Sequence, residues 1–129
     1  MNSIHFEWKL DDEYYTLLSF CVNVTKAKEI IQNKPRQLQD FDIQDLAKWT
    51  KRPIIKPDGT MTMTIGHNVD WNKIDHGEVN LDFPLILATY KDELMLIDGW
   101  HRVAKAYDQG IHILPGVVLT EQETKKILL

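Results

Sequence analysis

The fold of this chain is decided by a stretch in which a strand pattern changes into a helix pattern at a glycine. The stretch reads Leu94-Met95-Leu96-Ile97-Asp98-Gly99-Trp100-His101-Arg102-Val103-Ala104-Lys105-Ala106-Tyr107. Its first part is apolar at consecutive positions, which predicts a strand over Glu93–Asp98 in the middle of a sheet. Gly99 breaks this strand, and the apolar spacing after it predicts a helix over Trp100–Gln109.

The neighbouring segments upstream extend this unit. Leu85–Tyr90 is predicted to be a strand that connects to Glu93–Asp98 through a tight turn at Lys91-Asp92. In the helix that follows, Val103, Ala104 and Tyr107 are expected to share the buried face.

The segments downstream carry clear stop and start signals. The helix is expected to end at Gly110, because glycine suits a left-handed C-terminal cap. Ile113–Leu119, entered through Pro115, is the next predicted strand. Thr120-Glu121-Gln122-Glu123 has the capping-box pattern and predicts a last helix that runs to the Ile127-Leu128-Leu129 end.

The N-terminal part has weaker patterns. The period-two alternation over Ile4–Leu10 predicts a strand, and the apolar, β-branched run Tyr14–Val24 predicts its partner in a hairpin. Thr25 is expected to cap a helix over Lys26–Asn33 that Pro35 ends.

The middle of the chain completes the predicted architecture. Asp42 is expected to cap a helix over Ile43–Thr50, and the alternation over Met61–Ile65 predicts one more strand. The order of elements indicates the α+β class, a small mixed sheet with flanking helices. The length of 129 residues and the lack of a long linker predict a single domain. Within it, residues 1–80 form a hairpin and helices and residues 81–129 form the core.

Composition narrows the class of protein. The net charge of -4 and the sequence pI of about 5.7 argue against a protein that coats nucleic acid through bulk charge. A single cysteine, Cys21, excludes an internal disulfide and a multi-thiolate zinc site, and its apolar surroundings predict a buried, inert thiol. No apolar run approaches the roughly 18 residues that a membrane span needs, and no leader pattern is present, so we expect a cytoplasmic protein without membrane attachment.

The turn at Gly99 has the chemistry of an anion site. A strand that ends in glycine and turns at once into a helix leaves unpaired backbone N–H groups at the positive end of the helix dipole. Arg102, in the first turn, can fork onto two phosphate oxygens. His101 adds a donor whose charge changes near neutral pH, and Lys105 lies one turn further along.

The same residues also have purely structural interpretations. Asp98 can cap the helix, and Arg102 can pair with Asp98 or another acid. His101 can be a packing residue, and Trp100 can belong to the core or to a lid.

This strand–turn–helix–strand unit resembles the core of the ParB/sulfiredoxin superfamily. The resemblance covers about residues 80–120 and rests on the Asp98–Arg102 string, the alanine-rich helix, Gln109-Gly110-Ile111 and the strand around Pro115–Leu119. It implies a ParB/sulfiredoxin-like fold in which the corner at Gly99–Arg102 holds nucleotide phosphates. Sulfiredoxin has its catalytic cysteine where Trp100 stands here, so sulfiredoxin activity is not expected.

The resemblance implies a nucleotide-phosphate-binding protein, with Mg²⁺ and ATP or CTP as cofactors and NTP hydrolysis or phosphotransfer as the reaction. The alternative is a non-catalytic module that uses the same corner to bind a protein partner or, less consistently with the acidic charge, nucleic acid. Catalytic roles are predicted for His101, Arg102, Asp98 and Asp70. Ligand-binding roles are predicted for Gly99, Trp100, His101, Arg102, Lys105 and His67.

A second polar stretch, made of Gly66–Trp71 and Asp75-His76, lies just upstream of the core strands. We expect a loop there that folds over the corner. Acidic side chains in it and just after it could hold Mg²⁺ or act as a base; they are Asp70, Asp75, Glu78 and Asp82. The alternatives are a plain surface loop or a His67–Asp70 pair on a transition metal, and two ligands do not make a metal site.

Overall fold

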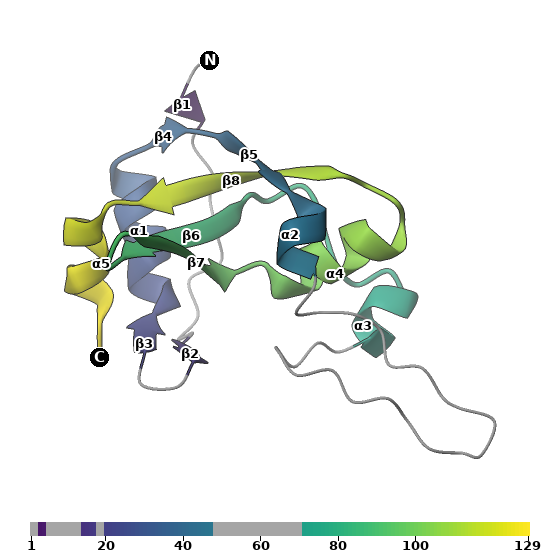
Figure 1. Cartoon of the computed structure of the whole chain (residues 1–129), viewed down its shortest axis with the longest axis horizontal. Helices are drawn as coiled ribbons and strands as arrows, with labels where there is room; N and C mark the ends of the chain where they lie inside the picture. The colour runs from purple at the N-terminus through teal and green to yellow at the C-terminus, as the bar shows by residue number, and fades with distance from the viewer. Residues whose placement is uncertain (1–2, 5–13, 18–19, 48–70) are drawn as a thin grey trace. The chain divides into compact units, whose positions relative to one another are not determined.

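A computed structural model describes residues 3–4, 14–17, 20–47 and 71–129 of the chain (Figure 1). The strands are β1 (Ser3–Ile4), β2 (Tyr14–Leu17), β3 (Phe20–Asn23), β4 (Arg36–Gln37), β5 (Gln39–Asp42), β6 (Leu85–Tyr90), β7 (Glu93–Asp98) and β8 (Ile113–Leu119). The helices are α1 (Val24–Asn33), α2 (Ile43–Ala47), α3 (Trp71–Asp75), α4 (Trp100–Asp108) and α5 (Glu121–Ile127). The predicted strand at Met61–Ile65 lies outside the described residues.

In the part of the chain that the structure describes, the largest sheet has four strands in the order β5-β8-β6-β7. Strand β6 pairs antiparallel with β7, with Tyr90 opposite Glu93, and parallel with β8, with Leu85 opposite Gly116. The sheet is therefore mixed and helices flank it, which confirms the predicted α+β class.

Strand β6 occupies the central position that the sequence pattern assigns to β7. The bounds of β7 are as predicted, but it is the last strand of the sheet among the described residues, and Leu94 is 53% exposed. In β6, by contrast, Leu85–Ala88 are all buried, because the strand has partners on both sides. The run of consecutive apolar residues in β7 therefore did not identify the central strand.

The predicted tight turn between β6 and β7 is confirmed. Lys91 has a φ of 49° and Asp92 a φ of 64°. Two central residues with positive φ match the twist that two-residue hairpins favour. The turn contacts α5 as well, since the Lys91 amide donates to Glu121 Oε1 at 2.9 Å.

The N-terminal hairpin differs from its prediction. Tyr14–Val24 is not one strand: Leu17 pairs with Phe20, so β2 and β3 form a hairpin within that run. No glycine, proline or asparagine marks the turn in the sequence, which is why the pattern predicts a single strand. Of the segment predicted to pair with it, Ile4 is described, and it pairs with Arg36 of β4.

Helix α1 begins earlier than predicted. Asn23, not Thr25, is the N-cap, and its Oδ1 accepts from the Lys26 amide at 3.1 Å. Thr25 instead lies buried in the first turn. The helix ends before Pro35, as predicted.

The remaining caps agree with the sequence. Asp42 Oδ1 accepts from the Gln44 amide at 2.9 Å, at the start of α2. The predicted last turn of that helix, residues 48–50, lies outside the described residues. At α5 both halves of the capping box form, because the Glu123 amide donates to Thr120 Oγ1 and the Thr120 amide donates to Glu123 Oε1.

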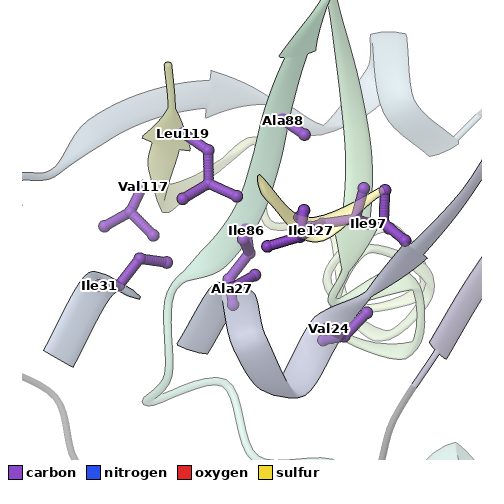
Figure 2. Packing of buried hydrophobic residues seen from close by; sticks show 10 residues of the cluster. Val24, Ala27, Ile31, Ile86, Ala88, Ile97, Val117, Leu119 and Ile127 are labelled. Atoms are coloured by element: carbon purple, nitrogen blue, oxygen red, sulfur yellow. The ribbon is translucent and has the colours of Figure 1, made fainter. Parts of the chain in front are cut away.

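The described residues group into two compact units, each discontinuous in sequence. The first contains residues within 1–40, 83–99 and 115–129, and the second contains residues within 41–82 and 100–114. Figure 2 shows the core of the first unit, where side chains from α1, β6, β7, β8 and α5 meet. Its buried members are Val22, Val24, Ala27, Ile31, Ile86, Ala88, Ile97, Val117, Leu119 and Ile127.

The second unit is built from α2, α3 and α4. Helix α4 packs against both of the others, and Ile74 and Val79 lie in one buried cluster with Ala104. Cys21, in the first unit, is half-buried, so the prediction of a buried thiol is wrong. None of the described helices has the length and apolar character needed to cross a membrane.

Candidate functional site

The candidate site is the corner where β7 gives way to α4. Strand β7 ends at Asp98, Gly99 has a φ of 112°, and α4 begins at Trp100. A positive φ as large as this is readily adopted only by glycine, so Gly99 lets the chain turn from strand to helix within one residue. The first N–H groups of α4 have no acceptor within their own helix, as at every helix start.

A β-bulge lies directly before the corner, which the sequence does not reveal. Asp98 is opposite Ile86 and Leu96 is opposite Leu87, so Ile97 is an extra residue in β7. Bulges bend a strand and re-aim the side chains next to them, and they are frequent beside functional sites. Here the extra residue lies directly before Asp98 and Gly99.

The predicted polar residues of the corner lie together in the chain at the helix start. Trp100, His101 and Arg102 are the first three residues of α4, and all three are half-buried, as is Asp98 at the end of β7. Half-burial leaves part of each side chain accessible while restricting its motion. The local arrangement therefore has the form that the sequence predicts, a glycine followed by a helix start with an arginine in its first turn.

Lys105 is engaged elsewhere. Its ammonium donates to the backbone carbonyl of Val79 at 2.5 Å, within the second unit. The side chain thus ties α4 to the segment that follows α3. Its predicted role in ligand binding stays a prediction, and one of its three N–H donors already has a protein acceptor.

The rest of α4 packs within the second unit. Val103, Ala104 and Ala106 are fully buried, whereas Tyr107 is 43% exposed, so its predicted place on the buried face is wrong. The reason is the helix geometry: Ala106, three residues after Val103, takes the inward position. The predicted cap at Gly110 is confirmed, with a φ of 74°.

The cap of α4 is a complete Schellman motif. The Gly110 amide donates to the Tyr107 carbonyl at 3.2 Å and the Ile111 amide donates to the Ala106 carbonyl at 2.8 Å. These two bonds satisfy carbonyls that otherwise have no partner at the helix end. Both ends of α4 are therefore fixed by a glycine.

The second polar stretch is partly helical. Trp71–Asp75 form α3, where the sequence predicts a loop. Asp75, Glu78 and Asp82 are exposed, and the packing of this segment against α4 uses the apolar Ile74 and Val79.

His67 and Asp70 lie outside the described residues, so their predicted roles stay predictions. Among residues 20–47 and 71–129, no group of three or more His, Cys, Asp or Glu side chains is arranged to hold a metal ion.

Comparisons with known proteins give no relative for this chain. No family model, no curated protein and no solved structure matches it. The ParB/sulfiredoxin-like identity therefore stays a prediction that rests on the residues of the corner.

Proposed function

We propose that the turn at Gly99 and the first turn of α4 bind the phosphate groups of a nucleotide, in the manner of ParB/sulfiredoxin-like proteins. One observation carries the proposal: β7 ends at Asp98, Gly99 has a positive φ, and a nine-residue helix starts at the next residue. Such a corner directs backbone N–H groups and the positive end of a helix dipole at one point.

Three side chains of the corner have complementary roles. Arg102 forms two parallel hydrogen bonds to phosphate oxygens, because its guanidinium matches the spacing of those oxygens. His101 donates a further hydrogen bond and contributes charge when protonated. Trp100 offers an aromatic face on which a nucleobase stacks.

A magnesium ion fits this site only as a companion of the nucleotide. Mg²⁺ is commonly held by one or two carboxylates together with phosphate oxygens and water. Asp98 is the described carboxylate nearest in sequence to the helix start, and Asp70 is the second candidate. The ion would neutralise phosphate charge, and the same carboxylates would orient an attacking hydroxyl or water in NTP hydrolysis or phosphotransfer.

The test is thermal unfolding of the full chain with Mg²⁺ and, separately, ATP, ADP, CTP and GTP. A nucleotide at ~100 times its dissociation constant stabilises a protein by about 2.7 kcal/mol, which raises the unfolding midpoint by on the order of 10 °C for this length. We expect such a shift with ATP or CTP, and we expect Arg102→Ala to remove it.

The matched control is Lys125→Ala, which removes an exposed cation from α5. It should leave the nucleotide shift unchanged. If no nucleotide shifts the unfolding midpoint of the wild-type protein, the proposal fails, and a non-catalytic binding module becomes the better interpretation. If Arg102→Ala and Lys125→Ala reduce the shift equally, binding is general charge attraction and the corner is not the site.

A further inference from the structure

The guanidinium of Arg36 is saturated by protein acceptors in the first unit. Nε and Nη2 donate to the Lys34 carbonyl at 3.2 and 2.9 Å, and Nη1 donates to the Val118 carbonyl at 3.3 Å. Nη1 and Nη2 also donate to Glu123 Oε1 and Oε2, at 2.5 and 2.9 Å. These bonds use all five N–H groups that an arginine side chain possesses.

Glu123 joins this arginine to the start of α5. Its Oε1 accepts from the Thr120 amide at 2.9 Å in addition to Arg36, so one carboxylate serves both the ion pair and the capping box. The two side chains are only 18% and 11% exposed, and 87 residues separate them in sequence. An ionised carboxylate can only accept hydrogen bonds, and the groups around Glu123 named here are all donors.

The charge of Glu123 is set by these contacts. Burial by itself raises the pKa of Glu123, but hydrogen bonds from Arg36 and Thr120 and the attraction of the Arg36 charge outweigh burial, so the pKa lies below its ordinary value of 4.5. Because the pKa is lowered on folding, the pair contributes its full stability above about pH 4.5, and this contribution is lost as the pH falls through the folded value.

We propose that the Arg36–Glu123 pair holds the segment Lys34–Gln37, which we call the strap, against the β8–α5 junction. Protonation of Glu123 opens the strap and the first turn of α5 together. The apolar core of the first unit stays closed. A protonated carboxyl places an O–H among N–H donors and cannot accept the full fork of Arg36. The segment contains β4, on which β1 is paired, so the strap also controls that two-stranded ladder.

The apolar core does not share this sensitivity. Ile127 of α5 and Val117 of β8 are buried in the core cluster, and apolar contacts do not titrate. Thr124, in the same helix, donates its hydroxyl to the Thr120 carbonyl at 3.0 Å, which is also independent of acid in this range. The strap is thus the acid-sensitive layer on an acid-insensitive core.

Other ionisable groups occur on α5 and on the elements that contact it, which are α1, β3 and β6. These groups are Glu121, Lys125 and Lys126 on α5, Lys26, Lys28 and Glu29 on α1, Lys34 in the segment Lys34–Gln37, Cys21 on β3, and Tyr90 with Lys91 at the end of β6. Among the described contacts of the Glu123 carboxylate, Arg36 is the charged donor. Of these groups, Glu29 and Glu121 are carboxylic acids like Glu123.

The experiment is hydrogen exchange of the full chain, followed by mass spectrometry, at neutral pH and at a series of lower pH values that continues until NMR shows Glu123 to be protonated. The exchange rates of peptides that cover Lys34–Gln37 and Thr120–Glu123 are compared with the intrinsic exchange rates of the same sequences, which gives the protection of each peptide. This protection is then compared with that of a core peptide from β6. At acid pH the wild-type protein should lose protection in both peptides by about tenfold more than in β6, the ratio expected for losing one charge-assisted interaction.

Glu123→Gln should show this loss already at neutral pH and no further selective loss in acid. Glu121→Gln, two residues earlier on the same helix, is the matched control and should behave as the wild type. Equal protection changes in the strap and in β6 would overturn the proposal, as would a wild-type response in Glu123→Gln. If Glu123→Gln does not fold, the titration of Glu123 in the wild-type protein, followed by NMR, should coincide with the opening of the strap, and a mismatch overturns the proposal equally.

Discussion

Lys105 of α4 and Val79, 26 residues earlier, are joined by a hydrogen bond from the lysine ammonium to the valine carbonyl. The bond lies beside the buried contact of Val79 and Ile74 with Ala104. It holds the segment after α3 against the helix whose N-terminus forms the candidate site. Lys105 therefore has a positional task that the sequence does not reveal.

This bond makes Lys105→Met a test of that task. Loss of a hydrogen bond from a charged donor to a half-buried carbonyl should lower the free energy of unfolding by about 1.5–3 kcal/mol, measured by urea denaturation. Lys73→Met, at an exposed position of α3, should change it by less than about 0.5 kcal/mol. Equal effects of the two variants would show that the Val79 bond contributes nothing to stability.

The same variant separates positioning from ligand binding. If Lys105 only supports the fold, Lys105→Met should keep a nucleotide-induced rise of the unfolding midpoint, although from a lower starting value. A complete loss of the nucleotide shift in a folded Lys105→Met protein would return Lys105 to the ligand-binding group.

Gly110 is a position where backbone conformation alone sets the cost of adding a side chain. Its φ is 74°, and a Cβ placed there meets nothing within 4 Å. Gly110→Ala should therefore cost about 1–2 kcal/mol of unfolding free energy from the left-handed backbone, with no steric contribution. Gly110→Asn should cost less, because asparagine tolerates this region, and denaturation of both variants checks the order.

The capping box of α5 predicts an effect at Thr120. Thr120→Ala removes the hydroxyl that accepts from the Glu123 amide at 3.1 Å, which should cost about 1 kcal/mol in urea denaturation. Thr120→Ser keeps the oxygen and should stay within a few tenths of a kcal/mol of the wild type. An alanine variant as stable as the serine variant would mean that the hydroxyl does not cap the helix.

The C-terminal end of the chain has one apolar residue in the core and another on the surface. Ile127 is 1% exposed in the core cluster, whereas Leu129 is 69% exposed. Ile127→Ala should cost about 2–5 kcal/mol of unfolding free energy, since it leaves a cavity. Leu129→Ala should change it by less than about 0.5 kcal/mol, and a reversal of this order would contradict the packing of α5.

The sequence by itself determined the elements whose signals lie within a few residues. The strand bounds of β6 and β7, the turn at Lys91-Asp92 and the capping box at Thr120 follow from local periodicity and from side chains that bond to their own backbone. The same holds for the glycine cap at Gly110. The corner at Gly99 belongs to this group, because a glycine between a strand and a helix is a local event.

Only the tertiary structure decided which segments meet. The strand order β5-β8-β6-β7 and the hydrogen bonds of Lys105 to Val79 and of Arg36 to Glu123 join residues far apart in sequence. The bulge at Ile97 is defined only by how β7 pairs with β6. No local pattern encodes such pairs, because their partners are selected by which surfaces the whole chain can bury together and by which polar groups must then find acceptors. The physical division is thus between backbone preferences, which act over one or two helical turns, and burial, which acts across the entire chain.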